Sequence, residues 1–543
     1  MSFLTSVFKA VLPKSLLPSD ELFFRYSSGR WLYNEAEQLA VRRVKFNVSA
    51  LQRVAAQAVG ATRCINMTKT HEGSFSKVFL LEFDNRKDLI AKVPTSLIPP
   101  FYTTASEVAT MDYAHNVLGI PMPRVLGWNA RTDPAVNPVG AEYILMEKAQ
   151  GDILHSRWDD LQGKMSTDLI HQMIGLEQRF AWYKFSQIGS LYYREDVESH
   201  LQDRPLYAPG TDTTYGQPER FRIGPLVDWD IWRGSRAALS VDRGPWPDAV
   251  SYLQGLYRIE QEWLRTYAKP YSPPFDRWTN DTPQDHIDLL EQLCVLMPYV
   301  VPPDISHSVL WHTDLHLANL FVEATPQAEL SAIIDWQSTS VAPLFMQASV
   351  PKFLLYKGED VIIDPGPVGP VLRIPIEDSP PEERPRLEKE LKMARRCKIY
   401  QLSMERDSLW HYAVHLYPFI DHVRGTTLRA ARSWYEGAEY VRDCVYQIGF
   451  AWEEIAPDAP LPIVMVKAEW DVHNEAYKRR VKYDARVQEL ARQMNIEMDG
   501  WVANDRYEEV RAMNARFMAE WDDEVEGGPY PFQDGAPSWF VGS

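Results

Sequence analysis

The segment from residue 309 to residue 322, VLWHTDLHLANLFV, constrains the fold of this chain more than any other stretch. Two short apolar runs, typical of strand ends, flank a polar loop that contains His312, Asp314 and Asn319. Asp and Asn are common in turns, but an ordinary turn between two strands does not need three side chains of catalytic type. The segment therefore predicts a functional loop held between two strands.

A second carboxylate follows at a spacing that a kinase-type site requires. Asp335 ends the apolar run AIID, 16 residues after Asn319, which itself lies five residues after Asp314. Phosphoryl transfer needs an oriented hydroxyl group and Mg²⁺ to neutralise the triphosphate. We therefore predict that Asp314 accepts the hydroxyl proton and that His312 is a second candidate catalytic residue. Asn319 and Asp335 are the predicted oxygen ligands of Mg²⁺, provided that both segments end at the same edge of a sheet.

The motif by itself has a simpler interpretation, a polar turn around a buried histidine, and the upstream sequence provides an independent check. Gly73 and Ser74 lie in a turn between strand-like segments, where backbone N–H groups can cradle phosphate. Lys92 lies in the apolar strand LIAKVP, where an unpaired charge is costly, and Glu107 on the following helix is its expected partner. Each signal is weak alone, but their order along the chain matches the order that a kinase-type site requires.

These motifs resemble the aminoglycoside phosphotransferase-like branch of the protein-kinase-like fold, whose catalytic loop reads H-x-D-x-x-x-x-N. Further stretches, among them FFRYSSGRWLYNEAEQLAVRR and IPMPRVLGWNA, are similar to fungal proteins of the altered inheritance of mitochondria protein 9 type. The likeness runs from residue 22 to beyond residue 450. It implies an α+β, bilobal fold with a small N-terminal sheet lobe and a larger, mainly helical C-terminal lobe that carries extra helices.

The resemblance also implies ATP and Mg²⁺ as cofactors, and it places the backbone of Met146, Glu147 and Ala149 at the hinge that meets adenine. Two departures from the protein-kinase pattern stand out. The phosphate loop has one glycine, Gly73, where protein kinases have three, so its grip on phosphate differs. The metal loop reads DWQ at 335–337 instead of Asp-Phe-Gly, which argues against a protein-kinase-style switch of that loop.

Patterning along the chain predicts its organisation. Helix caps are expected at Asn47 or Ser49 and at Thr103 or Thr104. The predicted segments are an N-terminal arm with a candidate targeting sequence (1–46), a nucleotide-binding N-lobe (47–150), a C-lobe with the catalytic and metal loops (151–363), a proline-rich linker or surface loop (364–385), a C-terminal helical extension (386–525) and a tail (526–543).

Composition narrows the class of protein and its partners. A net charge of −17 disfavours binding to nucleic acid, and no stretch approaches the roughly 18 consecutive apolar residues of a membrane span. Four widely spaced cysteines fit a reducing compartment. The basic, amphipathic segment 1–19, together with the resemblance, predicts a mitochondrial location, with the cytoplasm as the alternative.

The leading prediction is an ATP- and Mg²⁺-dependent phosphotransferase that acts on a hydroxyl group of a small-molecule acceptor. A nucleotide-binding pseudokinase or scaffold is the alternative, and a protein kinase is the third, disfavoured because no A-P-E closure follows Asp335. The acceptor and the oligomeric state stay open. His411 and His415 are four residues apart, as metal ligands on a helix would be, but a packed core pair is the favoured interpretation because no HExxH glutamate accompanies them.

Overall fold

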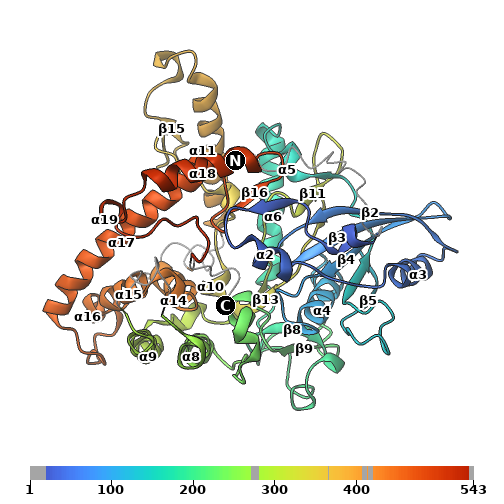
Figure 1. Cartoon of the computed structure of the whole chain (residues 1–543), viewed down its shortest axis with the longest axis horizontal. Helices are drawn as coiled ribbons and strands as arrows, with labels where there is room; N and C mark the ends of the chain where they lie inside the picture. Colours follow the sequence, from blue (N-terminus) through green and yellow to red (C-terminus); the bar gives the residue numbers. More distant parts are fainter. Residues whose placement is uncertain are drawn as a thin grey trace.

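The computed structural model describes residues 20–270, 281–364, 366–406, 413, 417 and 420–536. Figure 1 shows a small sheet lobe on the right and a larger helical part on the left, with one helical arm projecting at the top. The predicted α+β, two-lobed architecture is confirmed. The predicted targeting segment 1–19 and the pair His411 and His415 lie outside the described residues.

A five-stranded antiparallel sheet in the order β2-β3-β4-β6-β5 forms the small lobe. Alternation along β3 and β4 turns Phe79, Leu81 and Ala91 to the outer face, where they are fully buried. Lys92 therefore points to the opposite, inner face. The outer face is covered by α3 (Val48–Ala58), whose predicted cap Asn47 accepts a hydrogen bond from the Ala50 amide at 3.0 Å. The strands are β2 (Cys64–Glu72), β3 (Ser76–Phe83), β4 (Asp88–Pro94), β5 (Val125–Asn129) and β6 (Tyr143–Met146).

Helix α4 (Tyr102–Asn116) crosses the inner face of the sheet and is buried on nearly all sides. On its far side it packs against β8 (Ser190–Tyr193), which pairs antiparallel with β9 (Phe221–Gly224). The predicted cap at Thr103 or Thr104 is wrong. The hydroxyl of Thr103 donates to the Pro99 carbonyl at 3.0 Å and that of Thr104 donates to Glu142, so tertiary contacts set the start of this helix.

The larger lobe is built around α6 (Gly163–Phe180), α8 (Ala249–Tyr267) and α9 (Pro283–Val300), whose buried faces share one hydrophobic core. Two short ladders lie between this core and the sheet lobe. One pairs β10 (Ser308–Trp311) with β13 (Ser340–Pro343). The other has the order β12 (Leu330–Ile333), β11 (Leu320–Val322), β7 (Asp152–Ile153). The short helices α5 (Leu154–Arg157), α7 (Trp229–Trp232) and α10 (Leu344–Gln347) complete this part of the lobe.

The proline-rich segment 364–385 belongs to the projecting arm. It contributes β15 (Val371–Leu372), which pairs with β14 (Val361–Ile362), and it leads into α11 (Arg384–Met404), which runs along the arm (Figure 1). Further helices follow: α13 (Ile420–Ala430), α14 (Ser433–Glu436), α15 (Glu439–Phe450), α16 (Trp452–Ile455), α17 (Lys467–Met494), α18 (Tyr507–Glu520) and α19 (Asp523–Glu526).

The two ends of the described chain meet. The N-terminal segment contains α1 (Glu21–Phe24), β1 (Gly29–Trp31) and α2 (Glu35–Val41), and β1 pairs antiparallel with β16 (Trp501–Ala503) from the C-terminal extension. The N-terminal arm (1–46) and the C-terminal helical extension (386–525), predicted as separate segments, are therefore joined through β1 and β16. The extension has its own small core, formed by the inner residues of α17 and α18 with Tyr530 and Phe532.

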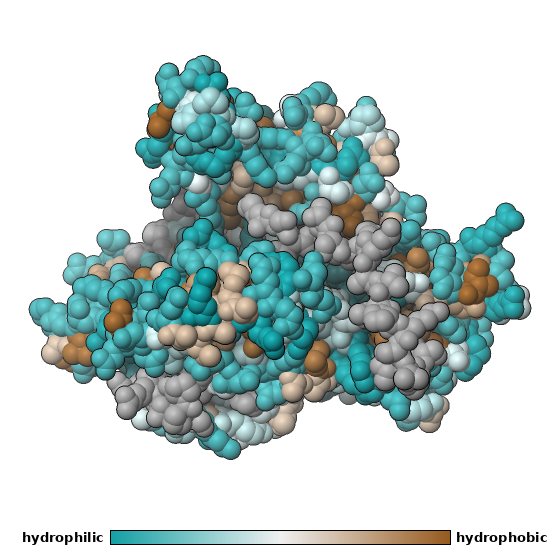
Figure 2. Space-filling view, turned by 45° about the horizontal axis from the view of Figure 1, so that its top comes forward, coloured by the Kyte–Doolittle hydropathy of each residue, from teal (hydrophilic) through white to brown (hydrophobic). Residues whose placement is uncertain are grey.

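The visible surface is mainly hydrophilic, with apolar side chains scattered singly or in small groups (Figure 2). Among the described helices, none combines the length and the apolar character that crossing a bilayer requires.

Candidate active site

The loops 312–319 and 334–339 lie beside each other because the two ladders hold both ends of each loop. Trp311 pairs with Ser340 in one ladder, and Leu320 pairs with Ile333 in the other. The expected single sheet edge is therefore wrong in detail, since two separate ladders supply the strand ends. The result is the same, because both loops are brought to one place below the inner face of the sheet lobe.

His312 connects the two loops. Its side chain is 1% exposed, its Nε2 donates to the Ile334 carbonyl at 3.1 Å, and its Nδ1 accepts from the Asp314 amide at 3.3 Å. The ring also packs edge-on against Trp336 at 4.9 Å. The bond to the Ile334 carbonyl raises the pKa of His312, but burial outweighs it and lowers the pKa overall. The lowered pKa favours a neutral ring. Both ring nitrogens are thus engaged within the protein, which fits a residue that positions the two loops, and the catalytic role of His312 stays a prediction.

The side chain of Asp314 is 64% exposed, so its carboxylate is open to solvent. Nε2 of His316 lies 3.4 Å from Asp314 Oδ2, and this interaction lowers the pKa of Asp314 and raises that of His316. Asn319 is buried, and its Nδ2 donates to the Asp314 backbone carbonyl at 3.0 Å. Because the amide nitrogen is committed, Oδ1 of Asn319 is the atom left to bind a ligand.

Lys92 lies between two carboxylates on the inner face of the sheet. Its Nζ is 2.7 Å from Glu107 Oε1 and 2.8 Å from Asp335 Oδ1. Lys92 and Glu107 are 5% and 2% exposed, whereas the side chain of Asp335 is 44% exposed. The predicted pairing of Lys92 with Glu107 is present in the structure, and the second pairing with Asp335 links the sheet lobe directly to the loop 334–339.

The charges in this triad favour an ionised lysine. Burial opposes the charge of Lys92, but Asp335 and Glu107 outweigh burial and raise the pKa of the lysine. Burial would also raise the pKa of Asp335, but Lys92 outweighs it and lowers that pKa. The pKa of Glu107 is raised because burial outweighs the attraction of Lys92, and its Oε2 has no hydrogen-bond partner within the described ranges.

Asp335 adopts a backbone conformation that residues other than glycine rarely take. Its φ is +62°, in the left-handed region. Strained backbone of this kind persists where the surrounding structure enforces it, and it is often associated with function. Here Trp336, fully buried, donates from Nε1 to the Ile333 carbonyl at 3.1 Å and anchors the loop.

Asp335 and Asn319 could hold a metal ion together, because both carry side-chain oxygen atoms. A backbone bond from the Ile334 amide to the Asn319 carbonyl at 3.0 Å holds the two residues near each other. The donor set therefore fits Mg²⁺.

The predicted phosphate loop and hinge flank the inner face. Gly73 and Ser74 form the β2–β3 turn, closed by a bond from the Gly73 amide to the Ser76 carbonyl at 3.0 Å. Met146 ends β6, and the Glu147 amide donates to the Arg124 carbonyl at 3.0 Å. The hinge then passes Ala149 to enter the larger lobe. Arg124 also binds the Glu147 carboxylate, so the hinge contributes backbone and not a free acidic side chain.

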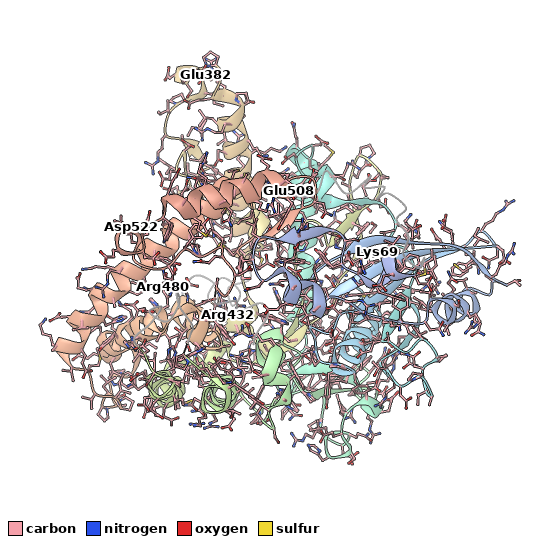
Figure 3. All side chains as sticks on the ribbon, in the orientation of Figure 1. Lys69, Glu382, Arg432, Arg480, Glu508 and Asp522 are labelled. Atoms are coloured by element: carbon pink, nitrogen blue, oxygen red, sulfur yellow. The ribbon has the colours of Figure 1, made fainter. Side chains whose placement is uncertain are left out.

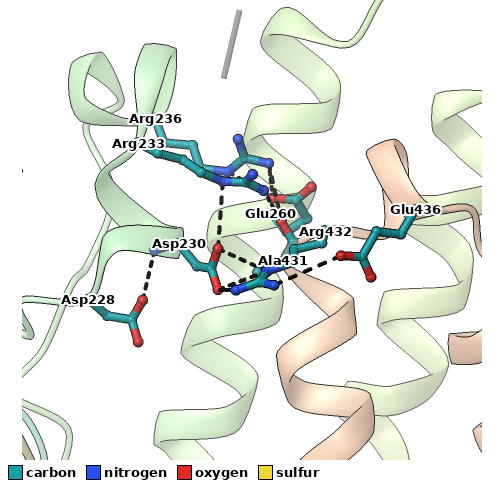
Figure 4. A network of polar contacts seen from close by, with 8 residues as sticks. All are labelled: Asp228, Asp230, Arg233, Arg236, Glu260, Ala431, Arg432 and Glu436. Carbon is teal, nitrogen blue, oxygen red and sulfur yellow. Dashed lines mark hydrogen bonds and ion pairs between the residues drawn. The ribbon is translucent and has the colours of Figure 1, made fainter. Parts of the chain in front are cut away.

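The β2–β3 turn also contacts the larger lobe. The ring of Phe75 meets Trp229 of α7 at 6.2 Å in an edge-on arrangement. Asp228 caps α7 by accepting from the Asp230 amide at 2.8 Å, and burial raises the pKa of Asp228 to about 6. Asp230 in turn binds Arg432 at 2.9 Å (Figure 4). A network of mostly buried charges therefore holds α7 beside the β2–β3 turn.

Three features of the site were not predicted from the sequence. They are the His316 contact to Asp314, the ion pair of Lys92 with Asp335, and the Phe75 contact to Trp229. The first had a signal, because a second histidine stands inside the motif. The other two join residues far apart in the chain and had none.

Comparisons with known proteins identify the family of this chain. A family model described as the phosphotransferase enzyme family matches residues 68–346, just over half of the chain. The chain belongs to this family. The match covers most of the five-stranded sheet and both loops of the site, and it confirms the resemblance to the aminoglycoside phosphotransferase type.

Individual relatives share about a quarter to a third of their aligned residues with this chain. A subtelomeric hrmA-associated cluster protein of Aspergillus fumigatus is 34% identical over 324 residues, which cover 53% of this chain and 60% of that protein. Altered inheritance of mitochondria protein 9, mitochondrial, from Yarrowia lipolytica is 27% identical over 364 residues, 63% of this chain and 62% of that protein. The chain thus spans less than two thirds of the length of these relatives.

Among solved structures, aminoglycoside phosphotransferase APH(4)-Ia is similar at 12% identity and a TM-score of 0.34, covering 74% of this chain and 98% of that one. A putative fructosamine-3-kinase from Thermobifida fusca is similar at 12% identity and a TM-score of 0.32, covering 72% of this chain and 99% of that one.

Proposed function

We propose that this member of the phosphotransferase family transfers the γ-phosphate of ATP to a hydroxyl group of a small-molecule acceptor. The observation that carries the proposal is the position of Lys92, which is paired at once with Glu107 and with Asp335 of the loop that follows the catalytic-type motif. A buried lysine with two carboxylates is a preformed cation at the place where a triphosphate would lie.

In this proposal each residue has one role. Lys92 binds the α- and β-phosphates, and Glu107 orients it. Asp314, whose exposed carboxylate has a lowered pKa, is ionised at neutral pH and orients the acceptor hydroxyl while accepting its proton. His312 positions both loops without touching the substrate.

Nucleotide and metal contacts are assigned on the same basis. Backbone groups at Gly73 and Ser74 cover the phosphates, and the backbone at Met146, Glu147 and Ala149 meets adenine. Asn319 and Asp335 would hold Mg²⁺, which when bound neutralises the phosphate charge. We propose residues 47–150 as the nucleotide-binding lobe and 151–363 as the lobe that carries the loops. A mitochondrial location is proposed from the names of the relatives.

The test measures binding first and turnover second. We expect Mg-ATP to stabilise the protein in a thermal-shift assay, and ATP to be consumed when a pool of small hydroxylated metabolites is added. Lys92→Met should lose the binding, whereas Lys87→Met, a change at an exposed lysine in the turn between β3 and β4, should keep it. Binding without consumption in any pool would favour the pseudokinase alternative, and no binding would refute the proposal.

A further inference from the structure

The C-terminal extension is attached to the N-terminal segment through β1 and β16. Arg30 of β1 lies opposite Val502 in the antiparallel register. Trp31 is 1% exposed, and its Nε1 donates to Asp499 Oδ2 at 3.0 Å. Arg30 also lies over the Tyr507 ring of α18 at 3.7 Å. Backbone pairing and buried side-chain contacts therefore attach the C-terminal extension firmly to the N-terminal segment.

The same N-terminal segment is anchored at the phosphate loop by a buried carboxylate. Glu72 is the last residue of β2 and directly precedes the glycine of the turn. Its Oε2 accepts from the Ser27 amide at 2.6 Å and from the Ser27 hydroxyl at 3.1 Å. Lys69 and Lys77 both donate to the Glu72 carboxylate and to the Arg25 carbonyl. The side chains of Glu72 and Lys77 are 1% and 0% exposed, so water does not compete for these bonds.

Asn504 links the extension to this anchor. Its Nδ2 donates to the Ser27 carbonyl at 2.7 Å, just after β16 ends. Ser27 is thus bound on one side by the extension and on the other side by the strand that leads into the phosphate loop. Figure 3 labels one residue at each end of this path, Lys69 at the sheet and Glu508 on α18.

We propose that Glu72 is a positioning residue for the phosphate loop, and that the C-terminal extension sets the loop through Ser27. A loop with one glycine has little conformational freedom of its own, so its place depends on where β2 ends. Backbone donors bind phosphate well only when they are held close to the productive geometry. The proposal rests on the proposed function for the identity of the ligand, but the order of the loop can be measured without any ligand.

Glu72→Gln tests the anchor, with Glu82→Gln as the matched control. Glu82 lies on the same hairpin but is exposed and binds only Asn66 among the described residues, at 2.6 Å. We expect Glu72→Gln to weaken ATP binding about tenfold while adenosine binding changes less than about twofold, because charge-assisted hydrogen bonds hold the loop and not the hinge. Hydrogen exchange at 70–80 without ligand should accelerate in this variant. Equal ATP affinity and equal exchange in the two variants would overturn the role of Glu72.

Gly29→Ala tests the part played by the extension. A Cβ at Gly29 would lie 2.4 Å from Trp501 Nε1 and 2.6 Å from the Val502 carbonyl, so it forces β16 away from β1. Gly175→Ala is the control, since a Cβ at Gly175 in α6 meets nothing within 4 Å. We expect Gly29→Ala to accelerate exchange at 70–80 and to weaken ATP binding, with no effect in the control.

Asn504→Ala removes one exposed bond and replaces Gly29→Ala if that variant does not fold, with the same direction and a smaller effect. Unchanged loop exchange in both variants would overturn the role of the extension. If the wild-type protein binds no ATP, the proposed function fails, and loop exchange alone then decides this proposal.

Discussion

Replacing Lys92 by methionine should destabilise the fold in a pH-dependent way, because Glu107 is left buried without its cation. Lys92 is the cation that lowers the pKa of Glu107, whereas burial and Asp335 raise it. Without Lys92, the folded protein must protonate this 2% exposed carboxyl, whose ordinary pKa is 4.5. Removing one partner of a buried ion pair costs about 3 to 5 kcal/mol, and we expect a loss near the lower end at pH 7 because the pKa of Glu107 is already raised in the wild type.

The sign of the pH effect follows from the raised pKa. A carboxyl with a folded pKa above its unfolded value costs stability above the unfolded pKa, and this cost shrinks as the pH falls. The penalty in Lys92→Met should therefore be smaller at pH 5.5 than at pH 7. Urea unfolding of the wild type and of Lys92→Met at both pH values measures this difference in the free energy of unfolding. Lys87→Met, at an exposed lysine, should change stability by less than about 0.5 kcal/mol.

The double variant Lys92→Met/Glu107→Leu separates stability from binding. Replacing a whole buried pair by apolar side chains often restores stability. We expect the double variant to recover most of the loss and still fail to bind Mg-ATP. An equal loss at both pH values, or a double variant as unstable as the single one, would refute the reasoning.

Further predictions concern the loops and the hinge. His312→Gln should lower kcat while leaving the Kd of Mg-ATP within about threefold, because the ring positions the loops and does not touch nucleotide; an unchanged kcat in steady-state assays would contradict this. His316→Ala should move the acid limb of the pH–rate profile to higher pH, since the pKa of Asp314 loses the hydrogen bond that lowers it; an unmoved limb would argue against the pairing. Gly151→Ala should cost about 1 to 3 kcal/mol in thermal unfolding, because its φ is +94° and a Cβ would lie 2.1 Å from a carbonyl of β11, while Gly210→Ala, with positive φ but no close neighbour, should cost less.

The sequence indicated which short segments carry the candidate residues, for a physical reason. Phosphate chemistry needs particular side chains at the ends of particular strands, and Lys92, Asp314 and Asp335 stand in short apolar contexts that reveal those strands. The ion pair of Lys92 with Asp335 had no signal in the sequence, because it joins residues 243 positions apart. The role of His312 could not be read at all, since a catalytic and a buried positioning histidine look the same in sequence.

Long-range features escaped prediction because they leave no local pattern. The β1–β16 pairing joins three-residue strands from opposite ends of the chain, too short to show an alternating pattern. The start of α4 was also misjudged, because the hydroxyl groups of Thr103 and Thr104 bind the Pro99 carbonyl and Glu142 instead of capping the helix. At the start of α4, tertiary contacts overrode the local capping signal.

The central claim is that one aspartate serves the acceptor and the other serves the nucleotide, and paired measurements on Asp314→Asn and Asp335→Asn test it most directly. Mg-ATP affinity by calorimetry and single-turnover phosphate transfer are measured on both variants, with ATP hydrolysis as the readout until an acceptor is found. We predict that Asp335→Asn weakens Mg-ATP binding, whereas Asp314→Asn binds normally and transfers about 10² to 10⁴ times more slowly. Wild-type binding and turnover in both variants would contradict the account.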